Sequence, residues 1–253
     1  MTEILNQVEP LYLLALGVFL LAGTVKGAIG IGLPTTSISI LSQFTDPRVA
    51  IAIGVMPMLL SNVWQMYREG KGWETIKRFW PFGAALFVTL FITSLFAASV
   101  AANAIMLITG LSIAIFAVTS LIREPPRMPA GWERAGMVGA GSAGGVMGGL
   151  TGLWSPPLVM LLLSLRLDKA DYVRAFGFLL VIGAAPLLGG YLINGLMTWE
   201  LFWVSMIMVI PTLMGFSVGE RVRGRMDTSR YQKAILVFFL IMGLNLIRRV
   251  LFG

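Results

Sequence analysis

The stretch that decides the fold runs from Gly23 to Pro34 and reads GTVKGAIGIGLP. Its glycines and proline interrupt a long apolar run, residues 11–44. A second long run, residues 135–165, is interrupted in the same register by residues 145–156, which read GVMGGLTGLWSP. Four residues of the first stretch are identical in the second: Gly23, Gly27, Gly30 and Pro34. A shared register over both runs indicates that the chain arose by internal duplication.

The composition points to a lipid bilayer as the surroundings of this chain. Of its 253 residues, 57% are hydrophobic and only 12% are charged, whereas a soluble domain carries about a quarter charged residues. It has no cysteine and no histidine, which removes thiol nucleophiles, imidazole bases and the usual zinc or haem ligands. We therefore expect no enzyme, no catalytic residue, no metal and no cofactor. The net charge of +7 is interpreted as loop charge beside a membrane, not as nucleic-acid binding.

Six further apolar runs have about the length of one membrane crossing, which takes about 20 residues. They are residues 49–67, 79–98, 102–122, 175–193, 201–220 and 231–250. We predict an all-α polytopic membrane protein made of two homologous halves, residues 1–124 and 125–253. Each half would contain one Gly/Pro-broken helical hairpin, formed by an interrupted run, and three transmembrane helices.

Loop charge predicts the orientation. Basic residues gather in three loops, which the positive-inside rule assigns to the cytoplasm: 68–78, 123–134 and 221–233. Three apolar runs separate the last two loops, and three single crossings cannot return the chain to the same side. We therefore expect the run 135–165 to enter and leave on one face, and the duplication extends this expectation to the run 11–44.

On this interpretation the two halves are inverted repeats. Arg248 and Arg249 would then lie outside, against the charge rule. The alternative has eight simple crossings and parallel halves. It places the more numerous basic residues of 221–233 outside instead.

The two breaks are also where we expect a substrate site. A helix broken at membrane depth exposes backbone N–H groups that line a cavity and attract an anion. Two such tips meet near the midplane of inverted repeats. The predicted substrate-binding residues are Lys26, Gly27, Gly30, Gly32, Pro34, Thr35, Thr36, Gly149, Thr151, Gly152, Trp154, Ser155 and Pro156. The competing interpretation of the glycines is close helix packing, and Arg48 and Arg174 are either entrance residues or interface anchors.

Lys26 is the only charged residue within the run 11–44. A cation at such depth costs several kcal/mol unless it is paired or faces a wet cavity, so it is functional by default. A lysine that reaches to the membrane interface is the alternative. No Asp or Glu lies in the middle of an apolar run, and the fixed positive charge therefore predicts an anionic substrate. Asn62 and Gln65 add polar groups near the expected site.

At these glycine- and proline-containing stretches the sequence resembles the sulfite exporter TauE/SafE family. The likeness lies in Gly23–Pro34 and Gly144–Gly152, in the chain length, in the two-half organisation and in the short basic central loop. The second stretch differs, because Leu153-Trp154-Ser155 stands where family members often have more glycine. The resemblance implies a permease of the bacterial inner membrane that moves sulfite or an organosulfur anion such as a sulfonate, usually outward.

Together these features predict an exporter that works by alternating access around a midplane site between the two hairpins. A passive anion channel and a non-transporting membrane scaffold subunit are the alternatives. The expected partners are the small anion and the lipid bilayer, with no nucleic acid. The sequence leaves open the anion, the direction, the coupling ion and the oligomeric state.

Overall fold

The computed structural model describes residues 2–69, 72–122, 126–129, 131–167, 169–223 and 228–252. Its ten described helices are α1 (Thr2–Ile29), α2 (Leu33–Leu41), α3 (Pro47–Glu69), α4 (Gly72–Leu95), α5 (Ala102–Ile122), α6 (Glu133–Thr151), α7 (Ser155–Ser164), α8 (Lys169–Ile193), α9 (Trp199–Arg223) and α10 (Thr228–Phe252). The predicted boundary at residue 124 lies outside the described residues, as do Lys71, Arg123 and Arg225 of the basic loops.

Seven of the described helices are long and apolar enough to cross a membrane. Six of them match the six predicted single crossings: α3, α4, α5, α8, α9 and α10. The prediction of an all-α polytopic membrane protein is thereby confirmed. The seventh is the segment Pro10–Ile29 of α1. The sequence pattern predicts one hairpin for the whole run 11–44. In the structure, the first arm of this run is by itself as long as a membrane crossing.

Both interrupted runs break at the predicted glycines. Gly30 and Gly32 follow α1 with φ of 84° and 102°, and Gly152 follows α6 with φ of 69°, a left-handed conformation that glycine adopts without steric cost. The helices after the breaks, α2 and α7, have 9 and 10 residues. At 1.5 Å per residue each is about 15 Å long, half of the ~30 Å hydrocarbon core. The second arm of each hairpin is therefore too short to cross the hydrocarbon core.

Polar contacts define one end of the bundle, which we call the basic end. Arg78 Nη2, in the first turns of α4, pairs with Glu133 Oε1 at the start of α6 over 3.0 Å. The backbone N–H of Met128, between α5 and α6, donates to the Ser164 carbonyl oxygen at the end of α7 over 2.9 Å. These junctions carry the basic loops that the charge rule assigns to the cytoplasm.

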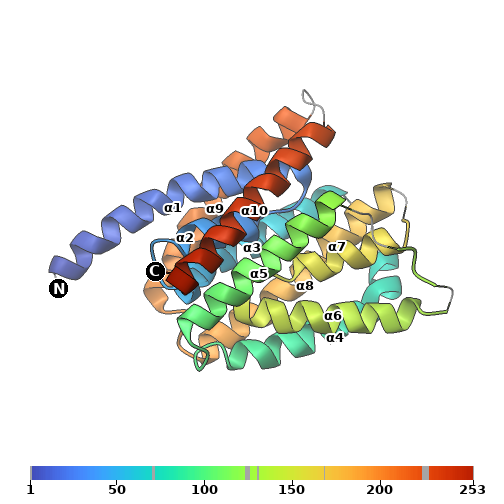
Figure 1. Ribbon diagram of the computed structural model, residues 1–253, viewed down its shortest axis with the longest axis horizontal. Coiled ribbons are helices and arrows are strands. Elements are labelled where there is room, and N and C mark those ends of the chain that lie inside the picture. The colour runs from blue at the N-terminus through green and yellow to red at the C-terminus, as the bar shows by residue number, and fades with distance from the viewer. Residues whose placement is uncertain are drawn as a thin grey trace.

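The other end, which we call the opposite end, is joined by arginines. Arg48 Nε, at the start of α3, donates to the Ala97 carbonyl oxygen between α4 and α5 over 3.0 Å. Arg249 Nη1, near the end of α10, donates to the Ser42 carbonyl oxygen just after α2 over 2.9 Å. The C-terminus accordingly lies beside α2 (Figure 1). The predicted position of Arg249 outside the membrane counted against the inverted arrangement. In the structure, Arg249 binds the end of the first hairpin.

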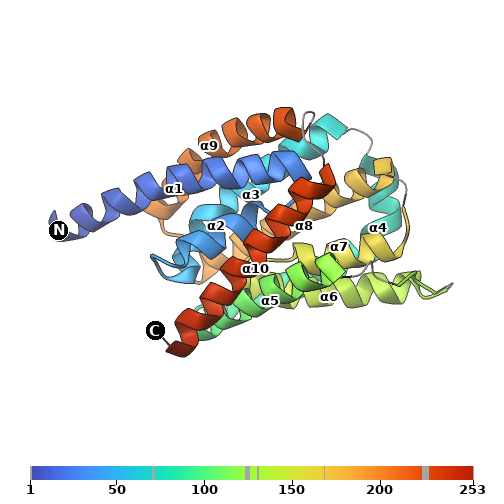
Figure 2. The ribbon, with the colours of Figure 1, turned by 45° about the horizontal axis from the view of Figure 1, so that its top comes forward.

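The two hairpins enter the bundle from different ends. Tyr12, near the start of α1, donates to Glu200 Oε1 at the start of α9 over 3.2 Å, and α2 ends at Ser42, so α1 and α2 both meet the opposite end. The α6–α7 pair starts at Glu133 and ends at Ser164, both at the basic end. Figure 2 shows α2 returning beside α1. Each pair of helices thus reverses direction inside the bundle.

Glycines hold α1 closely against α9. A Cβ on Gly23 or Gly27 of α1 would collide with the backbone of α9, at Thr212 and Phe216 respectively. Gly215 and Gly219 of α9 face α1 in the same way. The four-residue spacing places each glycine pair on one helix face, and small residues allow two backbones to approach within a membrane.

Glycines also hold α6 closely against α4. Gly141, Gly145 and Gly149 of α6 face the backbone and small side chains of α4, from Phe82 to Ser94. Gly145 and Gly149 are the positions that the predicted duplication matches to Gly23 and Gly27, and both pairs pack a helix closely against another. For Gly23 and Gly145 the helix-packing interpretation is therefore the right one.

We expect Gly23→Ala to lower the midpoint of thermal unfolding by several degrees, because the added methyl group must push the α9 backbone away at an overpacking cost of about 1–3 kcal/mol. Intrinsic tryptophan fluorescence of the purified protein measures the midpoint. Gly17→Ala is the matched control, since it lies in the same helix and its Cβ would meet nothing within 4 Å. Equal midpoints for both variants would contradict the close packing of α1 on α9.

Candidate functional site

Lys26 lies in the last turn of α1 and only 2% of it is exposed. Its Nζ donates to Ser61 Oγ over 2.9 Å and to Asn62 Oδ1, both on α3. Both partners are neutral, and in the described part of the chain no carboxylate forms an ion pair with Lys26. An ammonium group has three N–H donors, and these two acceptors use two of them.

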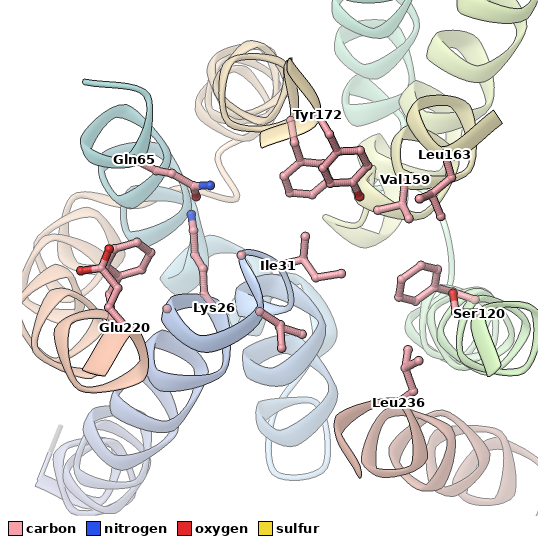
Figure 3. A pocket seen from close by; sticks show the side chains of 15 residues that line it. Lys26, Ile31, Gln65, Ser120, Val159, Leu163, Tyr172, Glu220 and Leu236 are labelled. Atoms are coloured by element: carbon pink, nitrogen blue, oxygen red, sulfur yellow. The ribbon is translucent and has the colours of Figure 1, made fainter. Parts of the chain in front are cut away.

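A cavity of about 350 Å³ lies next to Lys26. Its wall includes Ser120 of α5, Glu220 of α9 and Leu236 of α10, which all lie within the last or first turns of helices that meet at the basic end. Figure 3 shows Lys26 at one edge of this cavity with its amino group pointing toward Gln65. The cavity therefore faces the basic end, the side that loop charge assigns to the cytoplasm.

A second, much smaller cavity of about 10 Å³ lies between the two tips. Gly32 and Pro34 of the first tip line it together with Trp154 and Ser155 of the second, and Lys26 lines this cavity as well as the larger one. A water molecule needs about 10–15 Å³ of such space. The tips thus meet beside Lys26 and are almost closed on one another.

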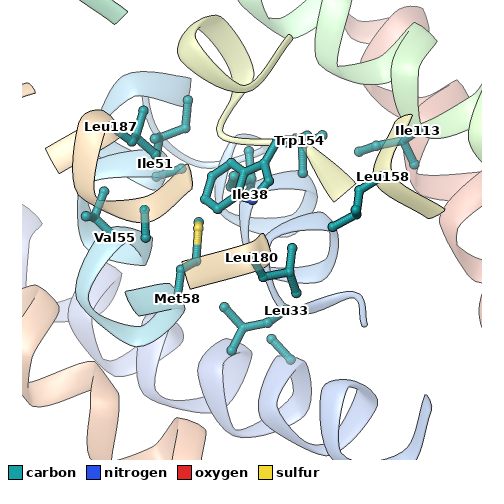
Figure 4. Close-up of a cluster of buried hydrophobic side chains, with 14 of the residues drawn as sticks. Leu33, Ile38, Ile51, Val55, Met58, Ile113, Trp154, Leu158, Leu180 and Leu187 are labelled. Carbon is teal, nitrogen blue, oxygen red and sulfur yellow. The ribbon is translucent and has the colours of Figure 1, made fainter. Parts of the chain in front are cut away.

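A buried apolar cluster covers the tips on the side of the opposite end. Figure 4 shows Trp154 in this cluster with Leu33, Ile38, Ile51 and Met58, all of which are at most 2% exposed. Ile38 and Ile51 belong to the parts of α2 and α3 that lie nearest the opposite end. The cluster therefore separates Lys26 from that end, while the larger cavity leaves it accessible from the basic end.

The two tips differ in their polar groups. In the first turn of α2, Leu33 and Thr35 carry backbone N–H groups, while that of Thr36 already donates to the Gly32 carbonyl oxygen over 2.8 Å. The first turn of α7 contains Pro156 and Pro157, which have no N–H group. Beside the second tip, the buried Trp154 Nε1 lies next to Gly183 of α8 and has no hydrogen-bond partner in the described structure.

The predicted site residues fall into two groups. Those that line one or both cavities are Lys26, Gly27, Gly30, Gly32, Pro34, Trp154 and Ser155. The others do not line either cavity: Thr35, Thr36, Gly149, Thr151, Gly152 and Pro156. Thr36 Oγ1 is buried without a partner among the described residues.

Three of the predicted site residues that line neither cavity have structural roles. Thr151 Oγ1 donates to the Met147 carbonyl oxygen over 2.7 Å and so stays within its own helix. Gly149 packs on α4. Gly152 ends α6 in a left-handed conformation beside Ile38 of α2.

The two arginines considered as entrance residues lie away from both cavities. Arg48 pairs with Asp46 Oδ2 over 3.1 Å and donates to the carbonyl oxygens of Ala97 and Val100, so it ties the start of α3 to the α4–α5 junction. Arg174 Nη2 pairs with Asp171 Oδ1 over 2.8 Å, one turn earlier in α8.

Sequence reasoning did not assign Ser61, Tyr172 or Glu220 to the site. Ser61 had a readable signal, since with Asn62 and Gln65 it forms a polar patch on one face of an otherwise apolar helix. Tyr172 and Glu220 looked like residues near the ends of runs. Burial raises the pKa of the Tyr172 phenol to about 12, so this hydroxyl on the wall of the larger cavity stays protonated near neutral pH.

The model of one protein family, described as "Sulfite exporter TauE/SafE", matches residues 15–246. This match covers both hairpins and almost all of the helices. No curated protein and no solved structure matches the chain.

We expect Ser120→Cys to react with a small water-soluble maleimide added from the side of the basic loops, since Ser120 lines the larger cavity. The chain has no cysteine of its own, so each variant carries a single thiol whose labelling mass spectrometry can measure. Ser39→Cys is the control and should stay unlabelled, because Ser39 is fully buried in α2. Equal labelling of the two thiols would contradict a cavity that ends at the tips.

Proposed function

Because the chain belongs to the sulfite exporter TauE/SafE family, we propose that it carries a small sulfur-containing anion, such as sulfite or an organosulfonate, out of the cell by alternating access. Members of this family are multi-pass membrane transporters and not enzymes. The proposed location is the bacterial inner membrane. Export fits the larger cavity, which faces the side that loop charge assigns to the cytoplasm.

The observation that carries this proposal is the charge of Lys26. Its ammonium group is buried, has only the neutral acceptors Ser61 and Asn62, and lines both cavities. An unpaired charge in such surroundings is costly, and an anion in the cavity offsets that cost. Because one cation and a few hydrogen bonds hold the anion, binding stays weak enough to permit release.

The small cavity and the apolar cluster favour a carrier over a passive channel. A channel needs a continuous aqueous path, whereas the tips are almost closed on one another and Trp154, Ile38 and Ile51 cover them. Transport would then require a second arrangement in which the basic end closes and the opposite end opens. A scaffold subunit would have no use for an unneutralised buried lysine.

We also infer that residues 1–124 and 125–253 are inverted repeats and that this symmetry supplies the second arrangement. The hairpins enter from different ends, and the duplicated glycines of α1 and α6 pack equivalent helices, α9 and α4. Exchanging the conformations of two inverted halves would turn a cavity facing one side into a cavity facing the other.

We expect Lys26→Ala to slow the counterflow of radiolabelled sulfite into proteoliposomes by about tenfold or more, since a hydrogen bond to a charged group contributes about 1.5–3 kcal/mol. Lys233→Ala is the matched control, because Lys233 is an exposed lysine of α10, and it should transport normally. The amount of protein inserted should be equal for both variants. Wild-type rates for Lys26→Ala would remove Lys26 from the mechanism.

A further inference from the structure

One face of α2 carries a row of buried hydroxyl groups. Thr35, Ser39 and Ser42 follow one another at helical spacing, and Thr36 lies one turn before Ser39. Residues three and four positions apart share a helix face, so these four residues form one row, which we call the hydroxyl row. All four are at most 3% exposed. The row begins at the first tip, beside Lys26, and ends where α2 reaches the opposite end.

Two hydroxyls of this row have no hydrogen-bond partner among the described residues: Thr36 Oγ1 and Ser42 Oγ. An unpaired buried hydroxyl is costly, and most buried polar groups are paired. Ser37 of the same helix avoids this cost, because its hydroxyl donates to the Leu33 carbonyl oxygen over 2.8 Å. Thr36 and Ser42 thus each keep a free donor, about 9 Å apart along the helix axis at 1.5 Å per residue.

Two arginines of α10 lie where the hydroxyl row ends. Arg249 Nη1 donates to the Ser42 carbonyl oxygen over 2.9 Å, and Asn245 Nδ2 donates to Gln43 Oε1 over 3.1 Å. Arg248 Nε in turn donates to Asn245 Oδ1 over 3.1 Å. In the described part of the chain neither arginine forms an ion pair. Both lie on the side where the charge rule disfavours basic residues, and attraction of an anion would give them a function there.

From these observations we infer that the hydroxyl row lines the route by which the anion passes between Lys26 and the opposite end. This inference rests on the proposed function and assigns residues to its outward step. Thr36 and Ser42 donate hydrogen bonds to the moving anion and so replace part of the water that it leaves behind. Arg249 attracts the anion at the mouth of the route.

The route passes beside the apolar cluster at Trp154 and not through it. Ile38 and Leu41 lie on another face of α2, and Ile38 belongs to that cluster (Figure 4). At the end of the row α2 is joined to α10 by the hydrogen bonds of Gln43 and Ser42. Opening the route therefore requires that α10 and α2 separate at the opposite end.

The unpaired hydroxyls allow a test that separates transport from packing. Thr36→Val and Ser42→Ala should each slow the counterflow of radiolabelled sulfite into proteoliposomes by about two- to tenfold, the effect of one neutral hydrogen bond. The thermal unfolding midpoint should stay at or above the wild-type value, because the removed hydroxyl has no partner to lose. A role in packing alone predicts wild-type transport for both variants.

Ser37→Ala is the matched control for both variants. Ser37 lies in the same helix and is equally buried, but its hydroxyl is bonded within α2 and points from another face. This variant should transport at the wild-type rate and unfold at a slightly lower temperature, since it loses a hydrogen bond.

Thiol labelling tests whether the route opens. Ser39→Cys should react with a membrane-impermeant maleimide added from the side of the opposite end, and should stay unlabelled from the side of the basic loops. Ser37→Cys should react from neither side, although both serines are fully buried in this structure. Equal labelling of the two thiols, or none of Ser39→Cys from the opposite end, would contradict the route.

The outcomes separate this inference from the proposed function. If the wild-type protein carries sulfite and both Thr36→Val and Ser42→Ala carry it equally fast, the inference is wrong and the proposed function stands. If the wild-type protein moves neither sulfite nor an organosulfonate in proteoliposomes, the proposed function fails and the inference fails with it.

Discussion

The candidate site is built around Lys26, which is buried in the bundle and forms no ion pair with a carboxylate of the described residues. Lys26 is held by Ser61 and Asn62 of α3, which satisfy two of its donors without cancelling its charge. A carboxylate at either position would give a stable ion pair and a site with nothing left to attract an anion. Neutral partners therefore hold the lysine in place without an ion pair, and a cavity lies beside it.

This arrangement requires a helix that ends in the middle of the bundle. A regular membrane helix satisfies its backbone internally and runs on to the interface. The left-handed glycines at 30 and 32 let the chain turn back after α1, so the last turn of that helix, with Lys26, stays at depth. Gly23 and Gly27 hold the same helix against α9. The glycines of this one stretch thus have two different roles: Gly23 and Gly27 allow close packing, and Gly30 and Gly32 allow the chain to reverse.

The second glycine-rich stretch packs as the first does but carries different polar groups. Gly145 and Gly149 hold α6 closely against α4. Gly148 occupies the position that corresponds to Lys26 in the first stretch. Two prolines remove backbone N–H donors from the start of α7. Trp154 fills the space beside the first tip. The first tip therefore contributes the buried lysine, and the second contributes a large side chain that covers it.

Much of this could be read from the sequence, because a bilayer permits few backbone solutions. Apolar run lengths determined the crossings, glycine and proline determined both breaks, and a lone lysine in an apolar run marked the charged site. The sequence could not determine which residues face Lys26, since contacts between α1, α3 and α9 depend on how helices rotate and cross. The rotation of α3 and α9 about their axes places Ser61 and Glu220 beside Lys26 or its cavity. The rotation of α6 places Gly149 against α4, and Thr151 bonds within its own helix. Whether a buried charge is neutralised depends on neighbours distant in the chain, and only the tertiary structure brings those neighbours together.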